Sequence, residues 1–165
     1  MRENIVLIGM PGAGKSTVGV VLAKTLGCDF LDTDILLSTR YGKPLQQILQ
    51  DAGQPEFLRL EGKLGAELRC ENTVVATGGS MVFSPEAMAN FRRSGRVVYL
   101  QVPFEELSRR IHNITTRGIA FAPNQTLRDL FEERTPLYEK YADLVISAVR
   151  DVEAAVTAIV EALHV

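Results

Sequence analysis

The chain is poor in the side chains that build disulfide frameworks and metal centres: it has two cysteines, two histidines and no tryptophan in 165 residues. Cys28 and Cys70 lie far apart without CxxC spacing, so we expect them to be small buried apolar residues. His112 and His164 also stand alone. This spacing argues against a metal site built from cysteine and histidine.

Long apolar runs and a strong excess of one charge are also missing. No run approaches the ~20 residues that a helix needs to cross a bilayer, and the run that follows Asn4 is too short for the core of a signal peptide. The formal net charge of −2 and the pI of about 5.7 provide no field that attracts nucleic acid or an anionic membrane. We therefore expect a cytoplasmic monomer whose partner is a small molecule, with no nucleic-acid or membrane partner.

The apolar pattern predicts one α/β domain that spans residues 1–165, because a chain of this length with 46% hydrophobic residues fits a single core. Strands are expected at 5–8, 30–31, 73–76, 97–100 and 144–146. Helices are expected at 16–26, 44–51, 56–70, 85–93, 103–111, about 126–141 and 152–163. This alternation predicts a three-layer fold in which helices flank a five-stranded parallel sheet. Residues 112–125 break the rhythm, and a connection of that length is typical of a functional or mobile segment, which we interpret as a mobile lid.

Residues 9–17 read GMPGAGKST and lie between an expected strand and an expected helix. They match the phosphate-binding pattern G-x-x-x-x-G-K-[ST] in full and in its proper context. Glycines allow backbone amides to close on phosphate oxygens, and the start of the helix directs its positive end at the same anion. A chance glycine-rich turn is the alternative. The expected nucleotide contacts are Gly12, Ala13, Gly14, Lys15, Ser16 and Thr17.

These residues predict a P-loop protein that binds ATP and Mg²⁺. Lys15 is expected to reach the β- and γ-phosphates, and Ser16 is expected to bind Mg²⁺. The chain lacks the N-K-x-D element that reads guanine, which argues against a GTP switch. Transport and motor proteins need further domains that 165 residues do not provide.

Asp32 and Asp34 follow the second expected strand. Residues at i and i+2 of an extended segment point the same way, so both carboxylates are expected to face the crevice at the carboxyl edge of the sheet. We assign Asp32 to Mg²⁺, and Asp34 to the hydroxyl of the phosphate acceptor, which it would orient or deprotonate. Alternatively, these acids are turn formers or helix caps.

The chain resembles the shikimate kinases, small P-loop enzymes that move the γ-phosphate of ATP to the 3-hydroxyl of shikimate, a step toward chorismate and the aromatic amino acids. The resemblance runs nearly end to end. It includes residues 9–17, the segment LDTD at 31–34, ATGG at 76–79, and ERTPLY at 133–138. It implies catalytic roles for Lys15, Asp34 and Arg117, where Arg117 would reach over the nucleotide from the lid.

The same resemblance implies an acceptor site that includes a helical region at about 33–62. The expected acceptor contacts are Asp34, Arg59, Gly78, Gly79, Ser80 and Arg134. Glycines 78 and 79 let the backbone approach a ring closely, although a simple turn at the end of a strand is the alternative. Arg134 would hold the acceptor carboxylate, or it would pair at the surface with Glu133 or Glu139.

The nucleotide side of the site depends on two further arginines. Arg117 would close over the phosphates, neutralise charge in the transition state and exclude water; an ordinary solvated arginine is the alternative. Arg109, or its neighbour Arg110, could stack on adenine.

The sequence departs from the family pattern at three places. Residues 57–61 read FLRLE where the family has Phe-Arg-x-x-Glu, so Leu58 replaces an arginine that grips the shikimate carboxylate. Arg59 does not simply substitute for it, because one residue turns a side chain by about 100° around a helix. Ser80 replaces a third glycine, and Gly118-Ile119 follows Arg117 where the family has Pro-Leu.

These departures leave three hypotheses for the function. Losing one partner of a charge-assisted pair typically costs about 2 to 5 kcal/mol, enough to change which acceptor is preferred. The first hypothesis is a shikimate kinase, and the second is a kinase of the same architecture with a different small hydroxylated acceptor. The third is an ATP-binding relative without catalytic activity.

Overall fold

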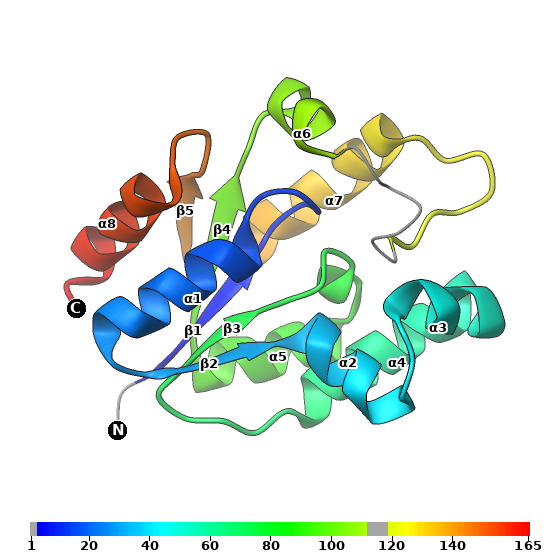
Figure 1. Cartoon of the computed structure of the whole chain (residues 1–165), viewed down its shortest axis with the longest axis horizontal. Helices are drawn as coiled ribbons and strands as arrows, with labels where there is room; N and C mark the ends of the chain where they lie inside the picture. The colour runs from blue at the N-terminus through cyan, green and yellow to red at the C-terminus, as the bar shows by residue number, and fades with distance from the viewer. Residues whose placement is uncertain (1–2, 112–118) are drawn as a thin grey trace.

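The five strands form one parallel sheet, as the sequence predicts (Figure 1). The computed structural model describes residues 3–111 and 119–165. The strands are β1 (Asn4–Ile8), β2 (Asp29–Asp32), β3 (Thr73–Ala76), β4 (Gly95–Gln101) and β5 (Leu144–Ser147), in the spatial order β2-β3-β1-β4-β5. Val6 of β1 is paired with Val75 on one side and with Val97 on the other. All three valines are fully buried, as expected for strands that helices cover on both faces.

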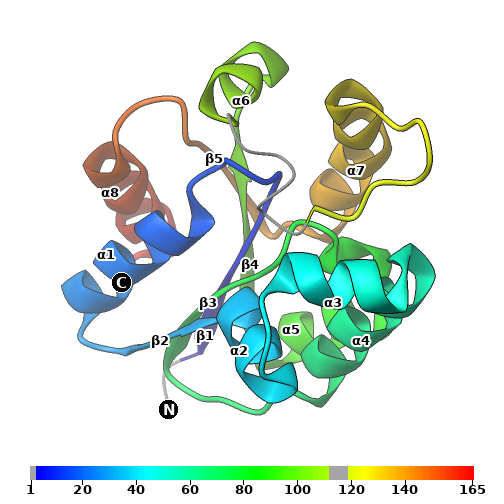
Figure 2. The ribbon, with the colours of Figure 1, turned by 45° about the vertical axis from the view of Figure 1, so that its right-hand side comes forward.

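Helices cover both faces of this sheet, which gives the three layers (Figure 2). The helices α1 (Lys15–Leu26) and α8 (Val152–Leu163) lie side by side against one face. The opposite face is covered by α5 (Pro85–Ser94) and α7 (Leu127–Tyr141). The short helix α6 (Phe104–Arg110) follows the end of β4. No helix in the described ranges combines the length and the apolar character that crossing a membrane requires.

Three further helices form a small helical group beside β2 and β3, within the region where the acceptor site is expected. They are α2 (Thr33–Tyr41), α3 (Leu45–Ala52) and α4 (Gln54–Glu67). Their apolar faces enclose a second, smaller core, whose buried members are Leu37, Ile48, Phe57, Leu64 and Ala120. This separate core holds the wall of the site next to β2 and β3.

The helix α2 and the 3-10 turn η1 (Met81–Phe83) are not among the predicted elements. The presence of α2 changes the geometry expected for Asp32 and Asp34. Asp32 ends β2 and caps α2: its Oδ1 accepts hydrogen bonds from the backbone amides of Asp34 (2.9 Å) and Ile35 (3.3 Å). Asp34 therefore lies in the first helical turn, so the expectation of extended geometry from Asp32 to Asp34 is wrong. The sequence carried a signal for this helix, an aspartate at its start and Gly42, with φ 66°, at its end.

The lid expected at 112–125 is only partly described. Residues 112–118, and with them the predicted lid arginine Arg117, lie outside the described residues. The next two residues, Ile119 and Ala120, are buried. They bring the segment before α7 into contact with both cores.

Close packing of α4 on α5 fixes the helix that forms one wall of the site. A Cβ at Gly65 of α4 would lie 2.6 Å from the sulfur of Met81 and 2.8 Å from the Cβ of Ala87 on α5. We predict that Gly65→Ala lowers the free energy of unfolding by about 1 to 2 kcal/mol, because overpacking outweighs the higher helix propensity of alanine. Urea unfolding measures this difference.

Lys63→Ala is the matched control, because Lys63 lies on the same helix with an exposed side chain. Its effect should stay within about 0.5 kcal/mol of the wild type. A Gly65→Ala variant as stable as the wild type would show that α4 and α5 are not packed at this distance.

Candidate active site

A cavity of about 340 Å³ opens where the carboxyl ends of the strands meet. This edge is where parallel α/β sheets bind their ligands. Side chains from α1, α2, α4 and α7, together with the loops that follow β1 and β3, line the cavity. The predicted site residues among its lining are Gly12, Gly14, Lys15, Ser16, Thr17, Asp34, Gly79, Ser80 and Arg134. Folding thus collects in one place residues that are up to about 120 positions apart.

The loop at 9–14 presents backbone rather than side chains to this cavity. Gly14 is the N-cap of α1 with φ 92° and ψ 18°, a left-handed conformation that favours glycine. The amide of Ala13 donates to the carbonyl of Met10 (3.1 Å), and the Ala13 side chain is buried in the main core. The first amides of a helix have no partner within the helix, so they remain available to an anion.

Lys15 folds back across this loop. Its Nζ donates to the carbonyl oxygens of Gly9 (2.7 Å) and Met10 (2.9 Å). An ammonium has three N–H donors, so one remains for a phosphate oxygen. The pKa of Lys15 is lowered to about 8, mainly by burial; Arg134 adds to this effect, while Asp34, Asp32 and Glu61 oppose it.

Asp32 is a helix cap, one of the alternatives that the sequence left open, and its assignment to Mg²⁺ stays a prediction. Its Oδ1 caps α2, and its Oδ2 accepts a hydrogen bond from the Ser16 hydroxyl at 2.5 Å. Ser16 is exposed at the start of α1. This pair joins the end of β2 to the segment 9–17 and places a carboxylate oxygen beside the hydroxyl of Ser16, which lines the cavity.

Asp34 reaches the same cavity from α2, although not through the extended geometry expected for it. Burial raises the pKa of Asp34 to about 6; the nearby Asp32 adds to this effect, and Lys15 opposes it. A carboxyl group with a pKa just below neutral is suited to accept a proton near neutral pH.

Glu61 of α4 also lines the cavity, and it is not among the predicted site residues. Only 3% of it is exposed, and its Oε1 accepts a hydrogen bond from the hydroxyl of Ser80. The pKa of Glu61 is raised to about 7, mainly by burial; Asp34 adds to this effect, whereas Ser80, Arg134 and Lys15 oppose it. The signal for this residue is its place at the end of FLRLE, where it matches the glutamate of the family pattern Phe-Arg-x-x-Glu.

The glycine turn after β3 lies between the two carboxylates. A Cβ at Gly78 would overlap the carboxylate of Glu61 and lie 2.7 Å from Oδ1 of Asp34. Two side chains fix this turn: Thr33 accepts from the Gly78 amide (3.0 Å), and the Tyr138 hydroxyl donates to the Gly79 carbonyl (2.6 Å). Neither Thr33 nor Tyr138 was predicted, because both act across long sequence separations. Burial raises the pKa of Tyr138, which therefore keeps its proton.

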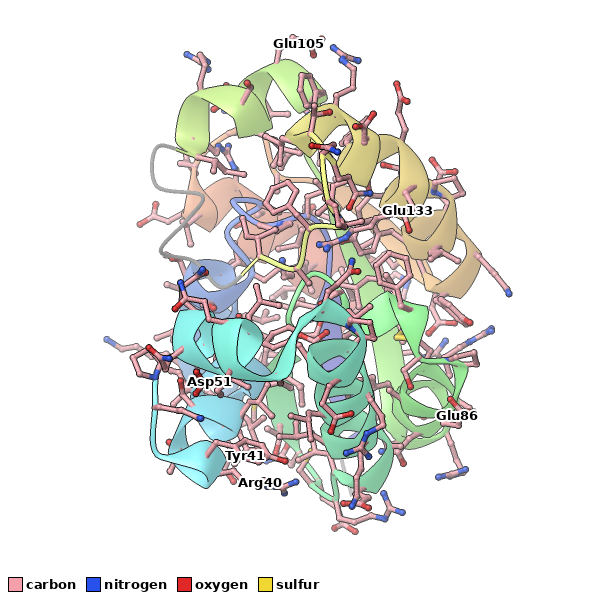
Figure 3. All side chains as sticks on the ribbon, turned by 90° about the vertical axis from the view of Figure 1, so that its right-hand side faces the viewer. Arg40, Tyr41, Asp51, Glu86, Glu105 and Glu133 are labelled. Carbon is pink, nitrogen blue, oxygen red and sulfur yellow. The ribbon has the colours of Figure 1, made fainter. Side chains whose placement is uncertain are left out.

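Arg134 lies inside the protein rather than at its surface. It is 1% exposed; its Nη2 donates to the Ala120 carbonyl (3.2 Å), and its buried Nε has no hydrogen-bond partner among the described residues. Its neighbour Glu133 points to solvent and accepts from Gln125 (2.6 Å; Figure 3). The alternative of a surface pair with Glu133 or Glu139 is therefore wrong, because Arg134 is buried and both glutamates are exposed.

Arg59 and Leu58, the two residues compared with the family's missing arginine, are not at this cavity. Arg59 is on the outer side of α4, where its side chain is 60% exposed and forms two hydrogen bonds with Glu56 (2.6 and 2.7 Å). Leu58 packs against the small core and borders a surface groove beside Phe83. The structure therefore does not bring Arg59 to the site as predicted, because its helical position turns it to solvent.

On the nucleotide side, the structure brings Arg110 rather than Arg109 to the cavity. The Arg109 side chain is 77% exposed and pairs with Glu106. Arg110 lines the cavity, with its guanidinium near the Gly12 carbonyl (3.3 Å) and bonded to the Ala148 carbonyl (2.9 Å). One position along α6 thus separates a solvent-facing arginine from one that contacts the phosphate loop.

The comparisons with known proteins agree with this geometry. The family profile described as shikimate kinase matches residues 11–164. The chain belongs to the shikimate kinase family. A shikimate kinase of Thiobacillus denitrificans is 37% identical over 159 residues, covering 94% of this chain and 87% of that protein. One from Thermobifida fusca is 40% identical over 148 residues, covering 88% and 86%.

A solved structure extends the likeness to three dimensions. Shikimate kinase from Acinetobacter baumannii in complex with shikimate superposes with a TM-score of 0.91 and 32% identity, covering 99% of this chain and 94% of that one. The predicted family and the predicted fold are both confirmed. The chain is therefore an ATP-dependent kinase.

The raised pKa of Glu61 predicts how stability depends on pH. Between its ordinary pKa of 4.5 and its folded pKa of about 7, the folded protein holds a proton that the unfolded chain has released. Glu61 therefore lowers stability as pH rises through this range, and the penalty is complete above the folded pKa. We predict that Glu61→Gln, which removes the buried charge, raises the free energy of unfolding at about pH 8 by about 1 to 3 kcal/mol.

Urea unfolding without nucleotide, at about pH 5 and about pH 8, measures this effect. The gain should be small at the lower pH, where Glu61 is already protonated. Glu67→Gln, which changes an exposed side chain on the same helix, should give the same difference at both pH values. A Glu61→Gln variant less stable than the wild type at the higher pH would contradict the assigned cost of burial.

Proposed function

We propose that the chain transfers the γ-phosphoryl group of ATP to the 3-hydroxyl of shikimate, which gives shikimate 3-phosphate and ADP. The buried guanidinium of Arg134 carries the proposal, because it lies in one cavity with Lys15 and Asp34 and has an Nε without a partner. A desolvated charge of this kind requires an anionic partner. Shikimate has one carboxylate, which suits a guanidinium, and hydroxyl groups, which suit Asp34.

The acceptor hydroxyl would lie against Asp34. As its oxygen forms a bond to the γ-phosphorus, the bond from that phosphorus to the β-phosphate oxygen breaks and ADP leaves. Asp34 would orient the hydroxyl and accept its proton, and its pKa of about 6 supports this role at neutral pH. The phosphates would rest on the backbone amides of residues 12–17, where Lys15 offers its remaining N–H.

We propose that Ser16 and Asp32 hold Mg²⁺, since hydroxyl and carboxylate oxygens are ligands that this ion accepts. Their contact at 2.5 Å supports the assignment. A bound Mg²⁺ ion neutralises charge on the β- and γ-phosphate oxygens. No group of three or more histidine, cysteine, aspartate or glutamate side chains forms a metal site in the described part of the chain.

Arg110 is the nucleotide-side arginine that we favour over Arg109, because of its contact with the loop at Gly12. The role of Arg117 remains a prediction. We further propose that the enzyme acts as a monomer, since one chain supplies every group assigned above. We place it in the cytoplasm, where ATP is available.

A kinase with a different hydroxylated acceptor remains the second candidate, and one observation favours it. Leu58 packs against the small core and supplies no positive charge, so Arg134 is the cation on the acceptor side of the described cavity. One guanidinium selects less strictly for a carboxylate than two would. An acceptor panel separates the two candidates.

We predict shikimate-dependent ADP release by the wild-type protein. Asp34→Asn should lower kcat by about 100-fold or more while ATP affinity changes little, because the carboxylate acts on the acceptor. A coupled ADP-release assay measures this effect, and Lys15→Ala, which removes the phosphate contact, should abolish transfer while the fold is retained. ADP release with another hydroxylated metabolite but not with shikimate would select the second candidate.

We predict that Arg134→Gln raises the KM for shikimate by roughly 30-fold or more, the usual effect of removing one partner of a buried charge pair. Arg59→Gln is the matched control and should leave KM unchanged, since Arg59 faces solvent. Initial rates over a range of shikimate concentrations measure both variants.

The wild type also provides a test that does not require the Arg134→Gln variant to fold. Methyl shikimate, in which the carboxylate is a neutral ester, should be a much poorer acceptor than shikimate. Equal use of the acid and the ester by the wild type would show that Arg134 does not bind the carboxylate.

A further inference from the structure

Ser80 and Glu61 form a buried hydrogen-bonded pair on the wall of the cavity. The two residues are 19 positions apart and come from different elements, since Ser80 follows β3 and Glu61 lies on α4. Both are buried, and the Ser80 hydroxyl donates to Oε1 of Glu61. Ser80 is one of the positions where this chain departs from the family pattern, and a glycine there would have no hydroxyl for this bond.

The backbone at Ser80 does not depend on its side chain. Its φ of −91° and ψ of 0° are accessible to any residue, and its carbonyl accepts from the amide of Phe83 (3.1 Å) in the turn η1. The side chain is therefore an addition to a turn that forms without it. What the hydroxyl contributes is its hydrogen bond to Glu61.

The Glu61 carboxylate needs this bond because of what surrounds it. Asp34 faces it from α2 and repels it, whereas Lys15 from α1 and Arg134 from α7 attract it. A buried carboxylate that loses a hydrogen-bond donor either takes up a proton or turns toward the remaining cations. The Ser80 hydroxyl opposes both changes.

The two carboxylates of the cavity converge on one place. A Cβ at Gly78 would overlap Glu61 and lie 2.7 Å from Oδ1 of Asp34, so both acids approach the same point of the turn. The two carboxylate oxygens are therefore at most about 5 Å apart. Hydroxyl groups on neighbouring carbons have oxygens about 3 Å apart, so each hydroxyl can reach its own carboxylate at an ordinary hydrogen-bond distance. The arrangement matches a vicinal diol better than a single alcohol.

We infer that Ser80 is a positioning residue that holds Glu61 as a second hydrogen-bond acceptor for the hydroxyls of the phosphoryl acceptor, beside Asp34. The inference rests on the proposed function and extends it from one hydroxyl of shikimate to two adjacent ones. Glu61 binds the second hydroxyl while Asp34 serves the reacting one. Ser80 therefore acts on acceptor binding, not on the transfer itself.

Ser80→Ala tests this role, since it removes the hydroxyl and keeps the backbone. The pKa of Glu61, followed by NMR of carboxyl-labelled glutamate and assigned with Glu61→Gln, should rise by about one unit because the bond that stabilises the charge is lost. The apparent pKa on the acidic side of the pH profile of kcat/KM for shikimate should rise by the same amount. At about pH 7 the KM should increase roughly fivefold with little change in kcat, because the ionised fraction of Glu61 falls from about one half to about one tenth.

Two controls separate positioning from general damage. Ser94→Ala removes a hydroxyl at the end of α5, where it bonds the Phe91 carbonyl, and should leave the pH profile unchanged. Ser80→Ala added to Glu61→Gln should increase KM little beyond Glu61→Gln alone, because Ser80 acts through Glu61. An unshifted Glu61 pKa and acid limb in Ser80→Ala, or independent effects of the two changes, would overturn the inference.

The NMR titration does not depend on turnover, so the two proposals fail in different ways. If shikimate is not phosphorylated but Ser80→Ala raises the pKa of Glu61, the identity of the acceptor is wrong and the positioning contact stands. If shikimate is phosphorylated and the pKa does not change, the function stands and the role of Ser80 is wrong.

Discussion

Mutual compensation of buried charges is the constraint on which this site depends. Lys15, Asp34, Glu61 and Arg134 lie around one small cavity, and each alters the pKa of at least one of the others. None would be stable there alone, because an isolated ion in a protein interior loses far more solvation than it recovers. Together, the two cations and the two acids offset part of the solvation that each of them loses on burial. The balance is incomplete, as the raised pKa values of both acids and the unpartnered Nε of Arg134 indicate. A substrate with both a carboxylate and hydroxyl groups complements what remains.

The backbone holds these charges in place with contacts that carry no charge of their own. The parallel sheet brings the ends of β1, β2 and β3 to one edge, so the phosphate loop, Asp32 and the Gly78 turn become neighbours. Hydrogen bonds from Tyr138 and to Thr33 then fix that turn between the acids. Packing of α4 on α5 sets the depth of Glu61. The small core around Phe57 therefore helps to set the position of Glu61, although none of its apolar side chains from α2, α3 or α4 lines the cavity.

Local sequence predicted the phosphate side of the site better than the acceptor side, for a physical reason. The phosphate loop is one continuous segment whose chemistry depends on backbone amides, so its nine residues carry the whole signal. The acceptor wall joins α2, α4, α7 and the turn after β3, and its contacts depend on how these elements pack. The pair Ser80–Glu61 spans 19 residues, and no periodicity indicates it. On a helix, an assignment that is wrong by one position exchanges a side chain in the site for one in solvent. Arg110 lines the cavity, whereas its neighbour Arg109 is exposed. The start of α2 is hard to predict because Asp32 ends the extended strand β2 and also caps the helix.

Two of the three departures from the family pattern, Leu58 and Ser80, fall on the side of the site where we propose that the acceptor binds. Leu58 lies one helical turn before Glu61, so at this point of α4 an apolar contact with the small core takes the place of a charge. Ser80 then supplies the hydrogen bond that Glu61 accepts. Neither residue contacts Ser16 or Asp32, and Lys15 bonds only loop carbonyls in the described structure. A change in acceptor preference would therefore affect acceptor binding and leave the contacts of Lys15, Ser16 and Asp32 as they are. This wall can vary independently because Leu58 and Glu61 lie on α4, outside the segment 9–17.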